Sequence, residues 1–169
     1  MLKPLLLSLG VLAFAVSLSH DAVKASPPPS VTFTGTAQDC SRIGDTLRAG
    51  HINVSAFQVS KARPIKAHLD SMATAQVNLA GAANDHAAFV HLDSMYVKLQ
   101  SMVAGTKALA RATSAVNGTF ALTFSAVDSV LVVGYQPQED QDFYYSSKVM
   151  TGQASRSFVL DMSRGGCGF

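Results

Sequence analysis

The chain has 169 residues, of which 48% are hydrophobic and 14% are charged. A chain of this length buries one ordinary hydrophobic core, so a single domain is expected. The formal net charge is +2, with 13 basic and 11 acidic residues scattered among one another, which argues against nucleic acid as a partner.

The first 25 residues have the pattern of a secretory signal. Lys3 precedes an apolar run over residues 4–18, and the small residues Val23 and Ala25 precede the proline-rich stretch SPPPS. Cleavage after Ala25 would place the chain on the periplasmic or extracellular side of the cytoplasmic membrane. The alternative is a retained membrane segment that touches the membrane surface. Its 15 helical residues would span about 22 Å, less than a hydrocarbon core of about 30 Å.

Residues 26–30 form the predicted linker, and residues 31–169 form the predicted domain. Cys40 and Cys167 are the two cysteines of the chain, and in an exported protein they predict one disulfide. Closing a loop of more than roughly 100 residues stabilises a fold by about 4 to 5 kcal/mol in the chain-entropy model. Two free thiols are the alternative.

Alternating residues predict strands at both ends of this domain. The segment VTFTGTAQD (31–39) sets Val31, Phe33 and Gly35 against threonines, and INVSAFQVS (52–60) repeats the pattern more loosely. The residues between them are rich in turn formers. Asn117-Gly118, followed by TFALTF (119–124), indicates a β-hairpin because Asn-Gly accepts positive φ.

Three further segments of the C-terminal third predict strands. SVLVVGYQ (129–136) is apolar on both faces, as a central strand should be. DFYYSSKVM (142–150) and SRSFVLDM (155–162) follow, with a short connection between them. In total about seven strands are expected, and they predict a mainly β, antiparallel Greek-key sandwich.

The middle of the chain has a different periodicity. From Pro64 to about Ala104 the apolar spacing changes to three and four, which predicts helices. A weaker helix is expected over about 65–80, and Asn84 or Asp85 could cap the start of a second one. The stripe on the second helix is Leu92, Met95, Tyr96, Leu99, Met102 and Val103. We therefore predict an α-helical hairpin inserted at about 62–106, between the second and third strands.

The word HLDSM occurs twice, at residues 68–72 and 91–95. On a helix, histidine and aspartate two positions apart point to nearly opposite sides and cannot chelate one ion. Leucine and methionine are three apart and share a face, so the repeat predicts an apolar seam. A metal site would need convergence from different helices, with His68, His86, His91, Asp70, Asp85 and Asp93 as the candidate ligands. We predict no bound metal.

No known catalytic or cofactor-binding spacing stands out. The chain has no H-E-x-x-H word, no G-x-S-x-G elbow, no P-loop and no dinucleotide fingerprint, so no catalytic residue and no cofactor are predicted. Glu139, Asp140 and Asp142 share one loop and could hold calcium. Solvated loop carboxylates are the commoner outcome, and they are the prediction here.

The strand words resemble the carboxypeptidase regulatory-like domain, a prealbumin-like (transthyretin-like) β-sandwich. Gly35 and Asp39 fit the family's first G-x-V-x-D element, Ala56 loosely fits the second, and Gly118 with Phe120 fits the D-x-x-G-x-F/Y hairpin. The similarity covers mainly residues 31–60 and 107–162. The hairpin aspartate is missing, and the helical insertion departs from the family pattern. The resemblance implies a non-catalytic module, and it assigns no functional residue.

Together these features predict a non-enzymatic, exported structural or interaction module. Its expected role is an extrinsic subunit that stabilises a membrane-embedded complex, such as a photosynthetic or respiratory assembly, with integral membrane subunits as partners. The candidate interface residues are Leu92, Tyr96, Phe143, Tyr144 and Tyr145, because aromatic side chains are enriched in interface cores. The alternative is a small-molecule or carbohydrate-binding module of the cell envelope.

Overall fold

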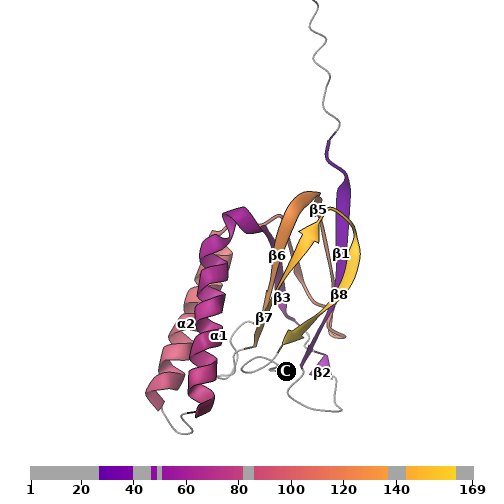
Figure 1. Ribbon diagram of the computed structural model, residues 1–169. Helices are drawn as coiled ribbons and strands as arrows, with labels where there is room; N and C mark the ends of the chain where they lie inside the picture. The colour runs from indigo at the N-terminus through magenta and orange to yellow at the C-terminus, as the bar shows by residue number, and fades with distance from the viewer. Residues whose placement is uncertain (1–26, 40–46, 49–50, 82–85, 137–143, 163–169) are drawn as a thin grey trace, which may run out of the picture.

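The computed structural model describes residues 27–39, 47–48, 51–81, 86–136 and 144–162. Within these ranges the chain is mainly β, with two four-stranded sheets and two long helices (Figure 1). The strands are β1 (Ser30–Asp39), β2 (Leu47–Arg48), β3 (Asn53–Gln58), β4 (Ala110–Thr113), β5 (Thr119–Ser125), β6 (Val127–Tyr135), β7 (Tyr145–Gly152) and β8 (Arg156–Met162). The 3-10 turn η1 (Val59–Lys61) leads into helix α1 (Arg63–Gly81), and helix α2 (His86–Gly105) follows. The predicted helical insertion between the second and third predicted strands is thereby confirmed.

Strand β1 organises the first sheet. It pairs antiparallel with β5 and, at its C-terminal end, with the two-residue β2. It pairs with β8 in parallel, so the prediction of a purely antiparallel fold is wrong for this pair. The three-residue connection after β7 reverses the chain, and the direction that results is that of β1. The Ser155 hydroxyl accepts a hydrogen bond from the Thr32 amide at 2.9 Å and fixes the start of β8 there.

The second sheet has the order β4-β3-β6-β7, and its strands are antiparallel. Its inner face shares one hydrophobic core with the first sheet. That core includes Val31 and Phe33 of β1, Phe120, Leu122 and Phe124 of β5, Leu160 and Met162 of β8, and Val54, Ala56, Val130, Val132 and Met150 of the second sheet. The alternation predicted for β1, β3 and β5 therefore places the expected side chains inside.

The Asn117-Gly118 turn does not close a β-hairpin, contrary to the prediction. Gly118 has the expected positive φ of 79°, and its amide donates to the Ala115 carbonyl oxygen at 2.8 Å. However, β4 before the turn pairs with β3, whereas β5 after it pairs with β1. The turn therefore carries the chain from one sheet to the other, because each flanking strand is paired with a partner more distant in sequence.

The helical hairpin covers the outer face of the second sheet (Figure 1). This explains why β6 is apolar on both faces, as predicted. Val130 and Val132 point into the core between the sheets, whereas Leu131 and Val133 join a second core beneath the helices. Helices α1 and α2 supply Ile65, Leu69, Met72, Tyr96, Leu99 and Val103 to that second core.

Several predictions lie outside the described residues and stay predictions. They are the signal or membrane segment over residues 1–25, the Cys40–Cys167 disulfide, the capping residues Asn84 and Asp85, and the carboxylates Glu139, Asp140 and Asp142. Neither of the two helices in the described ranges is long and apolar enough to cross a membrane.

Candidate interaction surface on the helical hairpin

The two copies of HLDSM meet in the helical hairpin. Leu69 and Met72 of the first copy and Leu92 of the second are buried, so the apolar half of the word packs as predicted. The two copies are also joined directly, because Nε2 of His68 lies 2.7 Å from the main-chain oxygen of Met95 and donates a hydrogen bond to it. His68 therefore holds α1 against α2.

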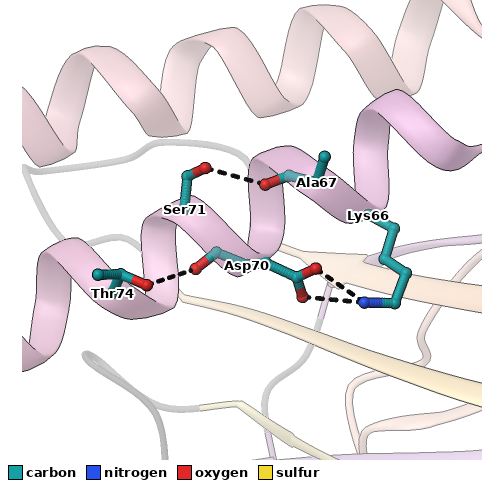
Figure 2. Close-up of polar contacts among 5 residues, drawn as sticks. All are labelled: Lys66, Ala67, Asp70, Ser71 and Thr74. Atoms are coloured by element: carbon teal, nitrogen blue, oxygen red, sulfur yellow. Dashed lines mark hydrogen bonds and ion pairs between the residues drawn. The ribbon is translucent and has the colours of Figure 1, made fainter.

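Asp70 and Ser71 of the first copy are satisfied within α1 itself. Nζ of Lys66 lies 2.8 Å from a carboxylate oxygen of Asp70, one helical turn away, and Figure 2 shows this ion pair. The hydroxyl groups of Ser71 and Thr74 donate to the carbonyl oxygens of Ala67 and Asp70, each at 3.0 Å. These side chains of the solvent face of α1 thus have internal contacts, and Asp70 is an ion-pair partner of a lysine.

The candidate metal ligands do not converge. In the described ranges, no group of three His, Cys, Asp or Glu residues lies close enough together to hold a metal ion. His86 and His91 are exposed on α2, while His68 faces α2 from α1. Asp85 lies outside the described residues.

Two of the five predicted interface residues belong to the interior instead. Leu92 and Tyr96 are 6% and 0% exposed, because the face of α2 that carries them packs onto the sheet and α1. Tyr144 and Tyr145 are half-buried against the two cores, and Phe143 lies outside the described residues. The interface role predicted for Tyr96 is therefore wrong, since its large apolar area serves the internal packing of this chain.

Tyr96 and Tyr145 connect the hairpin to the end of the second sheet. The Tyr96 hydroxyl donates to the main-chain oxygen of Gln136 and lies 3.2 Å from that of Tyr144. The Tyr145 hydroxyl donates to the Gln76 side-chain oxygen of α1 at 2.9 Å, and the Tyr96 and Tyr145 rings are 6.5 Å apart. Burial raises the pKa of both phenols from 10.0 to about 12.

These pKa values predict a loss of stability at alkaline pH. Below pH 10 both tyrosines are protonated in the folded and the unfolded chain, so they add no pH dependence there. Between the unfolded value of 10.0 and the folded value of about 12, only the unfolded chain releases its protons, so the free energy of unfolding falls as pH rises. For Tyr96 the loss is on the order of 2 kcal/mol.

Urea unfolding near pH 9 and near pH 11.5 measures this difference for the wild type and for Tyr96→Phe, which cannot ionise. The variant should be less stable near pH 9, because it lacks the phenol's hydrogen bonds, but its alkaline decrease should be clearly smaller. An equal alkaline decrease in the free energy of unfolding of both proteins would contradict the raised pKa of Tyr96.

The outward face of α2 differs from that of α1. Val90 and Val97 are 55% and 50% exposed, on the side of the helix opposite its buried stripe, while Phe89, at the start of that stripe, is 45% exposed. Helix α2 thus has apolar residues on two faces, one turned to the interior and one turned to solvent. Sequence reasoning identified only the first face, although the second was visible as a valine pair seven residues apart.

Arg111 of β4 fixes the C-terminal end of α2. Its Nη2 donates to the main-chain oxygens of Val103 and Thr106 at 2.7 and 2.9 Å, and its Nη1 donates to the Ser55 hydroxyl at 3.2 Å. The guanidinium also lies 5.8 Å from the centre of the Phe57 ring. A cation placed there satisfies helix-end carbonyls and complements the helix dipole. The outward face of α2 is therefore presented by a firmly anchored helix.

A shallow depression of about 470 Å³ lies beside Arg111 on the part of the second sheet next to α2. Polar side chains line much of it, namely Asn53, Ser55, Arg111, Thr113 and Tyr135. The guanidinium has five N–H donors, and the contacts to Ser55, Val103 and Thr106 use three of them.

No protein-family model matches the chain, and no curated protein matches it either. The similarity to the carboxypeptidase regulatory-like domain therefore rests on the strand words alone.

Proposed function

We propose that this chain is a non-enzymatic, exported interaction module and that its helical hairpin is the docking element. One observation carries the proposal: α2 exposes Val90 and Val97 on the face opposite its buried stripe and Phe89 at the uncovered start of that stripe. Exposed apolar groups on an ordered element are typical of a protein–protein contact. The anchoring by Arg111, Tyr96 and His68 keeps α2 rigid, which lowers the entropy cost of binding.

The fold proposed for this module is the prealbumin-like Greek-key β-sandwich of the carboxypeptidase regulatory-like domain, enlarged by the hairpin. The two sheets with one shared core support this proposal. The two-residue β2 would then be an addition to the seven longer strands of the described chain. The proposed role is that of an extrinsic subunit on the outer side of the cytoplasmic membrane, bound to integral membrane subunits.

Docking on membrane subunits can be tested by purifying the tagged full-length chain from solubilised membranes of its native host. The wild type should recover membrane subunits in a fixed stoichiometry. Phe89→Asp should lose them, because a charge would enter the apolar contact, whereas Val77→Asp on the exposed side of α1 should retain them. A chain that is recovered alone under mild detergent conditions would refute this role.

Intact mass spectrometry of the native protein tests both the predicted cleavage of the signal and the predicted disulfide. Removal of residues 1–25 should appear as a chain that begins at Ser26. The disulfide between Cys40 and Cys167 should lower the mass by about 2 Da relative to the reduced form. A full-length mass would favour the retained membrane segment instead.

The depression beside Arg111 favours a second candidate, a binding module for small anionic or hydroxyl-rich ligands. Its polar lining and the guanidinium suit a sugar acid. Calorimetric titration with glucuronate should then show binding that is weaker for uncharged glucose and lost in Asn53→Ala. The absence of heat with both sugars would remove this candidate.

A further inference from the structure

The exposed face of α2 carries a heptad pattern that its buried face does not explain. The residues on this outward seam are Ala87, Val90, Ser94, Val97, Ser101 and Ala104, and all six are exposed. Their spacing alternates between three and four, which is the a and d spacing of a coiled coil. The seam extends over most of a helix that is about 30 Å long.

The serine hydroxyl at the middle of the seam does not oppose burial. Ser94 donates its hydroxyl to the carbonyl oxygen of His91 at 2.6 Å, one turn back in its own helix. A hydroxyl satisfied in this way can enter an apolar contact without losing a hydrogen bond to water. The small side chains at a, together with valine at d, also allow two helices to approach closely.

We propose that a second copy of this chain docks on this seam, with the two α2 helices parallel and in register about a two-fold axis. The inference rests on the proposed function, because it adds a second copy of this chain as a partner of the same helix and leaves Phe89, which is not on the seam, for the membrane subunits. In this arrangement Val90 packs on Val90 of the other copy, and Val97 packs on Val97. The two bodies lie on opposite sides of the helix pair, since each buried stripe points away from the seam.

The charges beside the seam select both the partner and its direction. Asp93 is at a g position and Lys98 is at the following e position, five residues later. In a parallel pair each g residue faces the e residue of the other helix that lies five positions further along. Asp93 of each copy therefore faces Lys98 of the other, which gives two equivalent ion pairs. An antiparallel pair would place like charges on the same side, so the parallel arrangement is favoured.

The same charge pattern disfavours an anionic membrane surface as the occupant. Between Lys66 and Lys98 the sequence has no lysine or arginine, while Asp70, Asp85 and Asp93 are acidic. A polybasic surface is what anionic lipids attract, and this segment of the hairpin lacks one.

Sedimentation velocity of the protein, purified in the form that its native host produces, tests the inference. A single helix pair is a small interface, so we expect a reversible dimer with a dissociation constant on the order of tens of micromolar. Val97→Asp should weaken the dimer at least tenfold, because it would bury two like charges at one d layer. Val77→Asp, which changes an exposed valine of α1 away from the seam, should leave the dimer unchanged.

A charge exchange tests the direction of the helices. Asp93→Lys and Lys98→Asp should each dimerise more weakly than the wild type, because each homodimer then has two like-charge contacts. An equimolar mixture of the two variants should dimerise about as well as the wild type, since both contacts become attractive. Far-ultraviolet circular dichroism confirms that each variant is folded before it is compared.

Three outcomes would overturn the inference: a monomer at all concentrations up to about 500 µM, a dimer that survives Val97→Asp, or a mixture no stronger than its components. The docking experiment with Phe89→Asp has a separate readout. A monomer that still recovers membrane subunits through Phe89 would refute the self-association while leaving the proposed function intact.

Discussion

Gly35→Ala is expected to destabilise the fold by about 3 kcal/mol, because the added methyl group has no space. A Cβ atom at Gly35 would lie 2.2 Å from Cζ of Phe120, which is its directly paired neighbour on β5. The Phe120 ring cannot retreat easily, since it meets the Phe158 ring edge-on with centroids 5.6 Å apart. Phe158 is the neighbour of Gly35 on β8, so both rings close over the glycine.

Thermal unfolding measures this effect, and a decrease in Tm of about 10 °C is expected for a domain of this size. Gly105→Ala is the matched control, because a Cβ atom there has no neighbour within 4 Å. That control should be neutral or slightly stabilising, since alanine is favoured over glycine in a helix. A Gly35→Ala protein that unfolds within about 2 °C of the wild type would show that the rings can move apart.

Arg111→Ala is expected to cost about 2 to 3 kcal/mol and to loosen the hairpin from the sheet. The change removes the donors to the carbonyl oxygens of Val103 and Thr106 at the end of α2. It also leaves the hydroxyl of Ser55, a buried residue that is 2% exposed, without the Arg111 contact. Buried polar groups that lose a charged partner account for most of the expected loss.

Two variants make the Arg111 measurement specific. Lys107→Ala removes an exposed positive charge from the same α2–β4 connection, so it should change stability by less than about 0.5 kcal/mol. Arg111→Lys retains the charge but cannot form the fork of hydrogen bonds, and it should recover only part of the loss. Amide hydrogen exchange should show faster opening of α2 in Arg111→Ala. Equal stability of Arg111→Ala and Lys107→Ala would contradict the anchoring role.

Local periodicity was sufficient to predict much of the fold. The alternation in residues 31–39 and 119–124 identified β1 and β5 because each has one buried face. The doubly apolar stretch 129–136 identified β6 because helices cover its second face. The stripe from Leu92 to Val103 identified α2 because those side chains face the second core.

Pairing between distant strands could not be read from the sequence. Nothing local in residues 156–162 distinguishes a parallel neighbour of β1 from an antiparallel one. The Asn-Gly word specifies a turn conformation at Gly118, but it does not specify which sheet each flanking strand joins. Arg111 gave no signal either, because its role depends on where the end of α2 lies above β4.

The candidate surface was also beyond what local sequence could specify. An aromatic side chain such as Tyr96 is enriched both in cores and in interfaces, so residue type alone could not separate the two. The face of α2 that remains exposed became clear only once its buried face was known. A second apolar register on one helix was the signal that could have separated them.

Strand β1, the first of the domain, cannot complete its pairing until β5 and β8 have been synthesised. Thr32 meets Thr123 across a separation of 91 residues, and Thr34 meets Ser157 across 123 residues. Domains dominated by such distant contacts fold slowly, because long loops must close before any contact rewards them. The N-terminal half therefore has no finished layer to collapse onto while the rest is still being synthesised. A narrow translocation channel accepts an extended nascent chain, so under the export proposed above this topology would postpone folding until the last strand has crossed the membrane.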